Sequence, residues 1–307
     1  MIRQLRLTDL LAPVLPGPLG VDDRVVIHDE IGARCYRLTP AQIAKWSLLP
    51  SSGLHPIAAG TNTRLDTLAV VCTRRGPKAW EVAHLFVAEG RDEQLASVLM
   101  QAGRFVASRL GERLFIRLPY GNDEIRIAKE TGFRDAFTED VYQLPRSMLV
   151  DLQAPSLNVR PLLPSDTYGI FRLYSEVMSS SARSVAGLTL AQWQDSREES
   201  QKNVREYVWE SDQCIAAWIR LADRNGLLTI DAMLHPNERE MAGALVRFVA
   251  RLASGYEEPS WVVSSSQLGI AEELIQRGWG PTQRYVVLVR TLAAHVVEEP
   301  RLVAVGA

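Results

Sequence analysis

Residues 128–133 (AKETGF) and residues 275–279 (IQRGW) carry the same signal in two distant parts of the chain. Each is typical of the end of a helix, closed by a glycine and followed by an aromatic residue. Glycine suits the left-handed conformation that ends many helices. Gly278 lies 146 residues after Gly132. The two stretches therefore predict an internal repeat, and the prediction of the fold rests on it.

The elements around these glycines follow one order in both copies. An apolar strand precedes a helix with apolar residues at helical spacing, and another strand leads into the short helix and a closing strand. Leu99 matches Leu245 and Phe115 matches Trp261 at the same offset of 146. Chance agreement of apolar positions is the alternative, and the shared order argues against it. The expected elements are residues 82–87, 95–110, 115–116, 122–131 and 141–144, and then 228–234, 241–252, 261–263, 267–277 and 285–289.

Upstream stretches complete the order. Residues 160–161 (RP) and 164–166 (PSD) predict a strand and then a helix start, because Ser and Asp side chains accept hydrogen bonds from free helical amides. Asn225-Gly226 predicts a two-residue hairpin turn. Thr39 is expected to cap a helix beginning at Pro40. Antiparallel strands are expected at residues 207–209, 214–221 and 227–234, with a matching pair at 65–73 and 80–87.

Length and composition predict two globular domains. A chain of 307 residues is long for one core, so two domains of about 150 residues are expected, at residues 1–150 and 156–294. The shares of 47% hydrophobic and 23% charged residues are ordinary for folded proteins. Because strands and helices alternate, each domain is expected to be α/β with a mixed sheet.

Several classes of protein are disfavoured by the sequence. A net charge of -2 lacks the broad positive field that nucleic-acid or anionic-membrane binding requires. No apolar run approaches the length of a membrane span and no signal-peptide pattern is present, so a cytoplasmic protein is predicted. Three cysteines without CxxC spacing suggest neither disulfides nor a metal site. The sequence leaves the oligomeric state open.

The order of elements, together with the helix-Gly-aromatic endings and the RP and PSD opening, resembles the GNAT N-acetyltransferase superfamily. The resemblance covers almost the whole chain. It implies two tandem GNAT-like acyl-CoA N-acyltransferase domains, with acetyl-CoA as the donor and an amine of a small molecule or a peptide as the acceptor. It places the cofactor at the end of the fourth strand and the start of the next helix of each copy: Phe86, Val87, Arg91, Gln94, Leu95 and Ala96, and Met233, Leu234, Arg239, Met241 and Ala242.

The donor loops are degenerate. In the family this loop has Gln or Arg, two variable residues, Gly, any residue, and then Gly or Ala, so that helix N-terminal amides can face a pyrophosphate. Residues 91–96 (RDEQLA) have Gln94 where the first Gly belongs, and residues 237–242 (NEREMA) have Glu240 there. The acidic residues of these loops would oppose an anionic ligand, whereas in a first helical turn they stabilise the helix.

Candidate catalytic groups lie on the strands before these loops. Glu81 and Asp231 are the predicted catalytic residues, because relatives often place a base on the fourth strand, and His84 is a further candidate there. Each has a structural alternative: a solvated edge residue for Glu81, a solvent-facing one for Asp231, and a hydrogen-bonded core histidine for His84.

A proton donor to the thiolate is missing from its usual place. Many relatives have a Tyr four residues before the helix-ending Gly, and this chain has Ala128 and Leu274. Two hypotheses therefore stand: an acetyl-CoA-dependent N-acetyltransferase in which one repeat works, and a binding or scaffolding protein that has kept the fold and lost the chemistry. An aminoacyl or peptidyl transferase of the Fem type ranks below both, because no long helical arm or basic stretch is visible.

Overall fold

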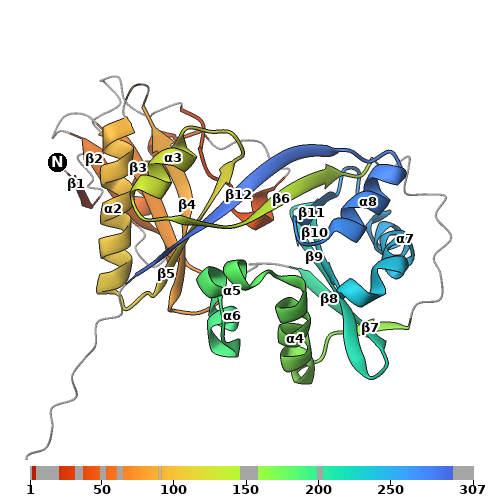
Figure 1. Cartoon of the computed structure of the whole chain (residues 1–307). Helices are drawn as coiled ribbons and strands as arrows, with labels where there is room; N and C mark the ends of the chain where they lie inside the picture. The colour runs from red at the N-terminus through yellow and green to blue at the C-terminus, as the bar shows by residue number, and fades with distance from the viewer. Residues whose placement is uncertain are drawn as a thin grey trace, which may run out of the picture.

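The computed structural model describes residues 2–4, 21–31, 37–48, 53–60, 65–88, 90, 92–145, 158–198 and 203–292. The strands of these residues form one 12-stranded mixed sheet (Figure 1). The strand order is β1-β2-β3-β4-β5-β12-β6-β11-β10-β9-β8-β7. The predicted α/β fold with a mixed sheet is confirmed.

The elements fall into two halves that repeat one order. The N-terminal half contains β1 (Ile2–Gln4), η2 (His28–Glu30), α1 (Pro40–Leu48), β2 (His55–Gly60), β3 (Leu65–Thr73), β4 (Ala79–Val87), α2 (Asp92–Ser108), β5 (Arg113–Pro119), α3 (Glu124–Glu130) and β6 (Arg134–Gln143). The C-terminal half contains β7 (Val159–Pro161), η5 (Pro164–Asp166), α4 (Thr167–Val177), α5 (Ser180–Ala186), α6 (Leu190–Ser196), β8 (Val204–Ser211), β9 (Cys214–Arg224), β10 (Leu227–Leu234), η6 (Pro236–Met241), α7 (Ala242–Ala253), β11 (Ser260–Ser264), α8 (Leu268–Gln276) and β12 (Pro281–Thr291).

Local sequence explains the boundaries of several elements. Gly132 and Gly278 have φ angles of 96° and 83°, so both short helices end in the left-handed conformation that the repeat predicted. Asn225 and Gly226 also have positive φ angles, 55° and 86°, as a tight hairpin turn between β9 and β10 requires. The Thr39 hydroxyl accepts a hydrogen bond from a backbone N–H in the first turn of α1.

The closing strands differ from the expected arrangement. The sequence suggested that each closing strand completes its own half, whereas β12 lies between β5 and β6 (Figure 1). β12 pairs with β5 from Tyr285↔Pro119 to Thr291↔Arg113, and β6 pairs with β11 from Ser260↔Gln143 to Ser264↔Glu139. The halves thus exchange their last strands. An apolar pattern specifies a strand but not its partner, and the division into residues 1–150 and 156–294 stays a prediction.

The exchanged strands carry core residues into the opposite half. Val286 and Leu288 of β12 belong to the core that packs under α2 and α3. Tyr142 of β6 and Leu144 just after it belong to the core under α7 and α8. Helices α1 and α4 cover the other face of the sheet, where separate apolar clusters form. Each half therefore depends on the other for part of its buried apolar surface.

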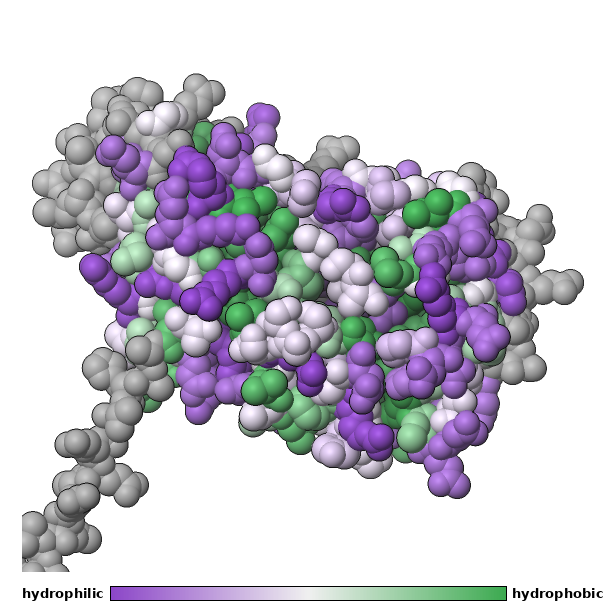
Figure 2. Space-filling model, in the orientation of Figure 1, coloured by the Kyte–Doolittle hydropathy of each residue, from purple (hydrophilic) through white to green (hydrophobic). Residues whose placement is uncertain are grey.

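The face of the molecule seen in Figure 2 is largely polar. In the view of Figure 2, hydrophilic residues cover most of both halves, and hydrophobic residues appear as small separate patches between them. In the part of the chain that the structure describes, no helix combines the length and the apolar character needed to cross a membrane.

The strand exchange predicts that neither half folds alone. Residues 1–150 and 156–307, produced separately, should each show no cooperative thermal unfolding, because each lacks one strand from the middle of the sheet. Mixing the two fragments should restore a cooperative transition, measured by circular dichroism and by size-exclusion chromatography. A fragment that melted cooperatively near the temperature of the whole chain would contradict this expectation.

Candidate functional site

The candidate site lies where two parallel strands part. β4 pairs with β5 over three residue pairs, and the last is Glu81↔Phe115, although β4 continues to Val87 and β5 to Pro119. We call the region beyond this pair the N-half wedge. The C-terminal half has the same arrangement, because parallel pairing of β10 with β11 ends at Asp231↔Val262. Glu81 and Asp231, the two predicted catalytic residues, thus occupy the same position in their wedges.

A segment from elsewhere in the chain crosses the N-half wedge. The backbone N–H of Arg24 donates to the carbonyl oxygen of Leu85 on β4 at 2.8 Å, and that of Val26 donates to the carbonyl oxygen of Arg117 on β5 at 3.4 Å. The N–H of Leu85 donates to the Asp23 carboxylate at 2.8 Å. The segment therefore uses hydrogen-bonding groups of both strand edges that face the wedge.

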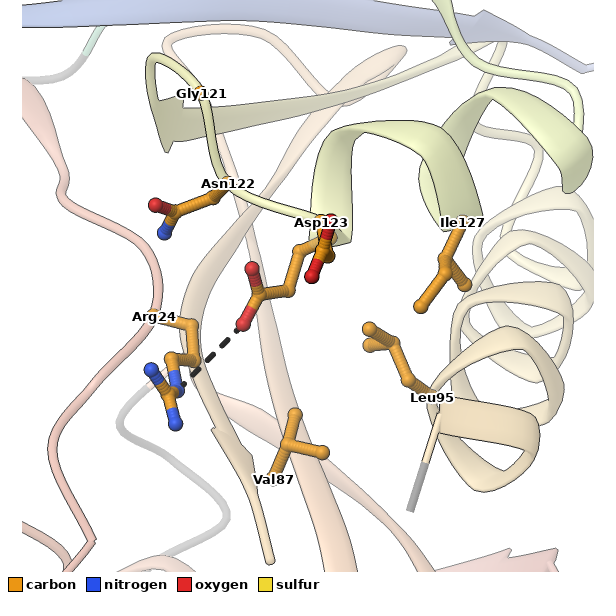
Figure 3. Close-up of a pocket in the computed structure, with 8 residues that line it drawn as sticks. Arg24, Val87, Leu95, Gly121, Asn122, Asp123 and Ile127 are labelled. Carbon is orange, nitrogen blue, oxygen red and sulfur yellow. Dashed lines mark ion pairs between the residues drawn. The ribbon is translucent and has the colours of Figure 1, made fainter. Parts of the chain in front are cut away.

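A pocket of about 310 Å³ remains at the outer end of this wedge. Val87 at the end of β4, Leu95 in the first turn of α2 and Ile127 on α3 form its apolar wall (Figure 3). Across the pocket, the Arg24 guanidinium approaches the Glu124 carboxylate at 3.6 Å (Figure 3). The turn between β5 and α3 completes the lining with Gly121, Asn122 and Asp123. The pocket thus joins an apolar wall to charged groups beside the tip of α2.

The C-terminal wedge is closed differently. The Gln267 side chain lies against the end of β10, where its carbonyl oxygen accepts from the N–H of Leu234 at 3.1 Å and its NH₂ donates to the carbonyl oxygen of Leu234 at 3.3 Å. Gln267 is 5% exposed. One side-chain amide therefore satisfies both backbone groups of Leu234, as a neighbouring strand would.

The structure brings only part of the predicted cofactor site together. Val87 and Leu95 line the pocket, whereas Phe86 points to the opposite face of the sheet and packs against the core beside α1. Gln94 is half-buried on α2, Ala96 packs against the neighbouring core, and Arg91 lies outside the described residues.

In the C-terminal half, the predicted residues do not converge on one pocket. Met233 packs with the cluster beside α4, while Leu234, Met241 and Ala242 belong to the core under α7. Arg239 is exposed and binds the Glu272 carboxylate. The role of these residues as a cofactor site stays a prediction.

A buried network of charges lies on the face of the sheet opposite α2. Arg74 contacts Glu81 at 3.1 Å and Glu198 at 3.0 Å, and its guanidinium lies 3.8 Å above the ring of Phe115. Arg117 contacts the same Glu198 carboxylate at 2.7 Å. Glu198 follows α6 in the C-terminal half, so its carboxylate joins that half to two arginines of the other.

The network shifts the pKa values of Glu81 and Glu198 in opposite directions. Burial raises the pKa of Glu81, with Arg74 lowering it and the charge of Glu198 raising it further, so its pKa lies above the usual value. Burial also opposes the charge of Glu198, but Arg117 and Arg74 outweigh it and hold the pKa well below the usual range. Glu81 is therefore the better proton acceptor of the two near neutral pH.

Asp231 is held in a second ion pair. Its carboxylate contacts His28 Nε2 at 2.5 Å and Arg220 Nη1 at 2.9 Å. Burial raises the pKa of Asp231, but His28 and Arg220 outweigh this and leave it below the usual value. A carboxylate with a lowered pKa is a weak base. Asp231 and Glu81 both lie outside the lining of the pocket, and their catalytic role stays a prediction.

The other candidates are in structural positions. His84 Nδ1 lies 2.7 Å from the Asp23 carboxylate, and its ring stacks on Trp46 with 5.2 Å between centroids. Ala128 and Leu274, at the positions where relatives carry a tyrosine, are fully buried. Among the described residues, no group of three His, Cys, Asp or Glu side chains has the arrangement of a metal site.

Solved structures share the fold of this chain, although no protein-family model and no curated protein matches the sequence. A GCN5-related N-acetyltransferase from Sphaerobacter thermophilus matches over 95% of this chain and 95% of that chain, with a TM-score of 0.53 and 14% identity. The chain has the GNAT fold. A conserved protein of unknown function from Staphylococcus epidermidis matches over 73% of this chain and 91% of that chain, with a TM-score of 0.51 and 10% identity.

A tandem GNAT protein from the clavulanic acid biosynthesis pathway, solved without acetyl-CoA, matches over 95% of this chain and 98% of that chain, at 15% identity and a TM-score of 0.48. Identities this low establish the GNAT fold alone, because one fold hosts many functions.

Sequence reasoning missed the residues that approach the N-half wedge from outside the repeat. Arg24 and Asp23 lie in a stretch with neither helical nor strand periodicity, so no local signal marks them. Asn122 was expected to begin the short helix, but α3 begins at Glu124 and leaves Asn122 in the turn that lines the pocket. The glycine of the preceding turn, Gly121, has a φ angle of 87°, and the run of residues 119–123 (PYGND) is the local signal of a turn there.

The Glu198 carboxylate is expected to stabilise the protein in a pH-dependent way. Because its folded-state pKa is lowered, its contribution is present above the usual value of 4.5 and is lost as the pH falls through the folded-state pKa. Glu198→Gln should therefore lower the free energy of unfolding by about 3 to 5 kcal/mol near pH 7, since it leaves two buried arginines without their shared partner.

The cost of Glu198→Gln should begin to shrink as the pH falls below about 4.5, because the unfolded chain then binds a proton at Glu198 while the folded chain still holds it as a carboxylate. Urea unfolding across this pH range measures it. The matched control is Glu130→Gln on the exposed face of α3, which should change stability by less than about 0.5 kcal/mol. A Glu198→Gln penalty that stayed constant with pH would refute the assigned role.

Gln267 offers a test of how the C-terminal wedge is closed. Gln267→Ala leaves the N–H and the C=O of Leu234 without their partner, so the free energy of unfolding should fall by about 2 to 4 kcal/mol. Gln276→Ala, on the exposed side of the same helix α8, is the control and should have little effect. Equal penalties for the two variants in chemical unfolding would contradict the bridging role.

Proposed function

We propose that this chain is an acetyl-CoA-dependent N-acetyltransferase that acts on an amine of a small molecule or a peptide, with its donor site in the N-terminal half. One observation carries the proposal: the N-half wedge ends in a pocket beside the tip of α2, while Gln267 closes the end of β10 in the other wedge. GNAT-fold relatives place the acyl donor at such a wedge, which supports the same use here.

The chemistry of the pocket fits the parts of an acyl-CoA. Val87, Leu95 and Ile127 offer apolar contacts for an aliphatic arm. The N-terminus of the 17-residue helix α2 favours phosphate groups. Gly90, with a φ of 67° and no atom within 4 Å of the place of a Cβ, adds no side chain of its own before α2.

The proposed base is Glu81. It belongs to the last parallel pair before β4 and β5 separate, so it lies beside the apex of the wedge. Its raised pKa brings it nearer to the range in which a carboxylate can take a proton from an ammonium group. Because Ala128 is buried and has no transferable proton, solvent is the proposed proton source for the departing thiolate.

Thermal unfolding with acetyl-CoA tests the donor site. Acetyl-CoA at a hundred times its dissociation constant should stabilise the chain by about 2.7 kcal/mol. Asn122→Trp fills the pocket and should abolish this stabilisation. Its matched control is Leu268→Trp, at the position 146 residues later, where the side chain is exposed on α8.

The control should keep the full response to acetyl-CoA. Loss of the response in Leu268→Trp but not in Asn122→Trp would move the donor site to the C-terminal half. Turnover is then measured as free thiol released from acetyl-CoA in the presence of a panel of amines, and Glu81→Gln should reduce the rate at least tenfold without weakening acetyl-CoA binding.

A second candidate function is a binding or scaffolding protein with the GNAT fold. The observation that favours it is that the chain's own Asp23, Arg24 and Gln267 hydrogen-bond to backbone groups of Leu85 and Leu234 at the edges of the two wedges. If this candidate is right, millimolar acetyl-CoA should stabilise neither the wild type nor variants in which these side chains are removed.

A further inference from the structure

Residues 23–31, which we call the strap, contact both halves of the molecule. At one end Asp23 binds the N–H of Leu85, and its carboxylate also contacts His84 at 2.7 Å. At the other end His28 contacts Asp231 at 2.5 Å, and Glu30 accepts a hydrogen bond from Arg224 at 2.6 Å. The strap precedes α1 in the chain, yet it joins β4 and β5 of one half to β9 and β10 of the other.

The middle of the strap fills the N-half wedge. Val25 is 3% exposed and belongs to the same core cluster as Val87 and Leu95, the two predicted cofactor residues that line the pocket. On either side of Val25, the N–H groups of Arg24 and Val26 donate to β4 and β5. A segment that lies along an open strand edge takes the hydrogen bonds that an extended ligand would need there. The strap and such a ligand therefore exclude one another at Leu85.

The far end of the strap covers the equivalent acid of the other wedge. His28 is 5% exposed and contacts Asp231, while Ile31 packs with Val262, the β11 partner of Asp231. One short segment thus occupies the N-half wedge and shields the base candidate of the C-terminal half.

The strap makes fewer backbone hydrogen bonds to the sheet than a paired strand does, although Val25, His28 and Ile31 are buried. Its ordered backbone contacts to the wedge are single hydrogen bonds to β4 and β5 rather than a continuous ladder. Its charged contacts include the pair between Arg24 and Glu124, in which the Arg24 side chain is 39% exposed. Release of the strap leaves the strand pairing of the sheet intact, so it is a local opening and not global unfolding.

We propose that the strap is a built-in competitor of the acyl donor: in the structure it closes the N-half wedge, and acetyl-CoA enters when the strap leaves. The identity of the ligand rests on the function proposed above, whereas the competition rests on the contacts of Asp23, Arg24 and Val26. The apparent affinity for acetyl-CoA is then the intrinsic affinity reduced by the fraction of molecules with an open wedge.

The first experiment weakens the strap at Asp23, which is not among the residues that line the pocket. Asp23→Ala removes the acceptor for Leu85 N–H and the contact with His84, and calorimetric titration with acetyl-CoA should show binding about tenfold to a hundredfold tighter than in the wild type. Asp22→Ala is the matched control, because Asp22 is exposed and pairs with Arg37 away from the wedge. It should bind acetyl-CoA with the wild-type affinity.

The second measurement uses the unmodified chain, so it holds even if Asp23→Ala fails to fold. Hydrogen exchange at the amides of Arg24 and Val26, which donate to β4 and β5, should become at least tenfold faster when acetyl-CoA saturates the protein. Exchange at the amide of Leu245, inside α7 of the other half, should stay unchanged.

The outcomes separate the two proposals. If acetyl-CoA binds and is turned over but Asp23→Ala binds it no tighter, or the strap amides do not exchange faster, the strap is no competitor and the proposed function stands. If acetyl-CoA binds neither the wild type nor Asp23→Ala at millimolar concentration, both proposals fail. If Asp23→Ala binds acetyl-CoA more tightly than the wild type and Asp22→Ala do, and acetyl-CoA makes the strap amides exchange faster, both proposals are supported.

Discussion

The insertion of β12 between β5 and β6 is the constraint on which the rest of the structure depends. β12 makes seven residue pairs with β5 and runs along β6 on its other side, so it sits in the middle of the sheet rather than at an edge. Val286 and Leu288 of β12 face the core under α2, while Tyr142 of β6 faces the core under α7. Burial of apolar surface on both sides of the exchange makes one cooperative body of two repeated halves.

The same exchange fixes where the buried charges meet. Arg117 lies on β5 and contacts Glu139 on β6, two strands that β12 separates, as well as Glu198 beyond α6. These three side chains are partly or fully buried and are joined by hydrogen bonds between opposite charges. Removal of one would leave a buried charge without its partner. The network therefore specifies one relative placement of the strands and of the segment after α6.

In both wedges, other parts of the chain hydrogen-bond to the backbone at the strand edges. In one wedge a main-chain segment supplies the hydrogen bonds, and in the other a single glutamine side chain does so. The pocket that remains beside α2 is small and mixed in character, with an apolar wall and the Arg24 and Glu124 pair. Two repeats with the same order of elements thus satisfy the same backbone edge in different ways.

Short-range patterns in the sequence determined the elements and their order. The glycines at 132 and 278, the Asn225-Gly226 turn and the apolar spacing of residues 95–110 are local signals, because backbone conformation and helix periodicity depend on near neighbours. Tertiary structure alone decided that β12 lies beside β5, that Glu198 joins Arg74 to Arg117, and that Asp23 reaches Leu85. Those contacts join residues far apart in the chain, and a strand or a carboxylate carries no local mark of the partner it will meet.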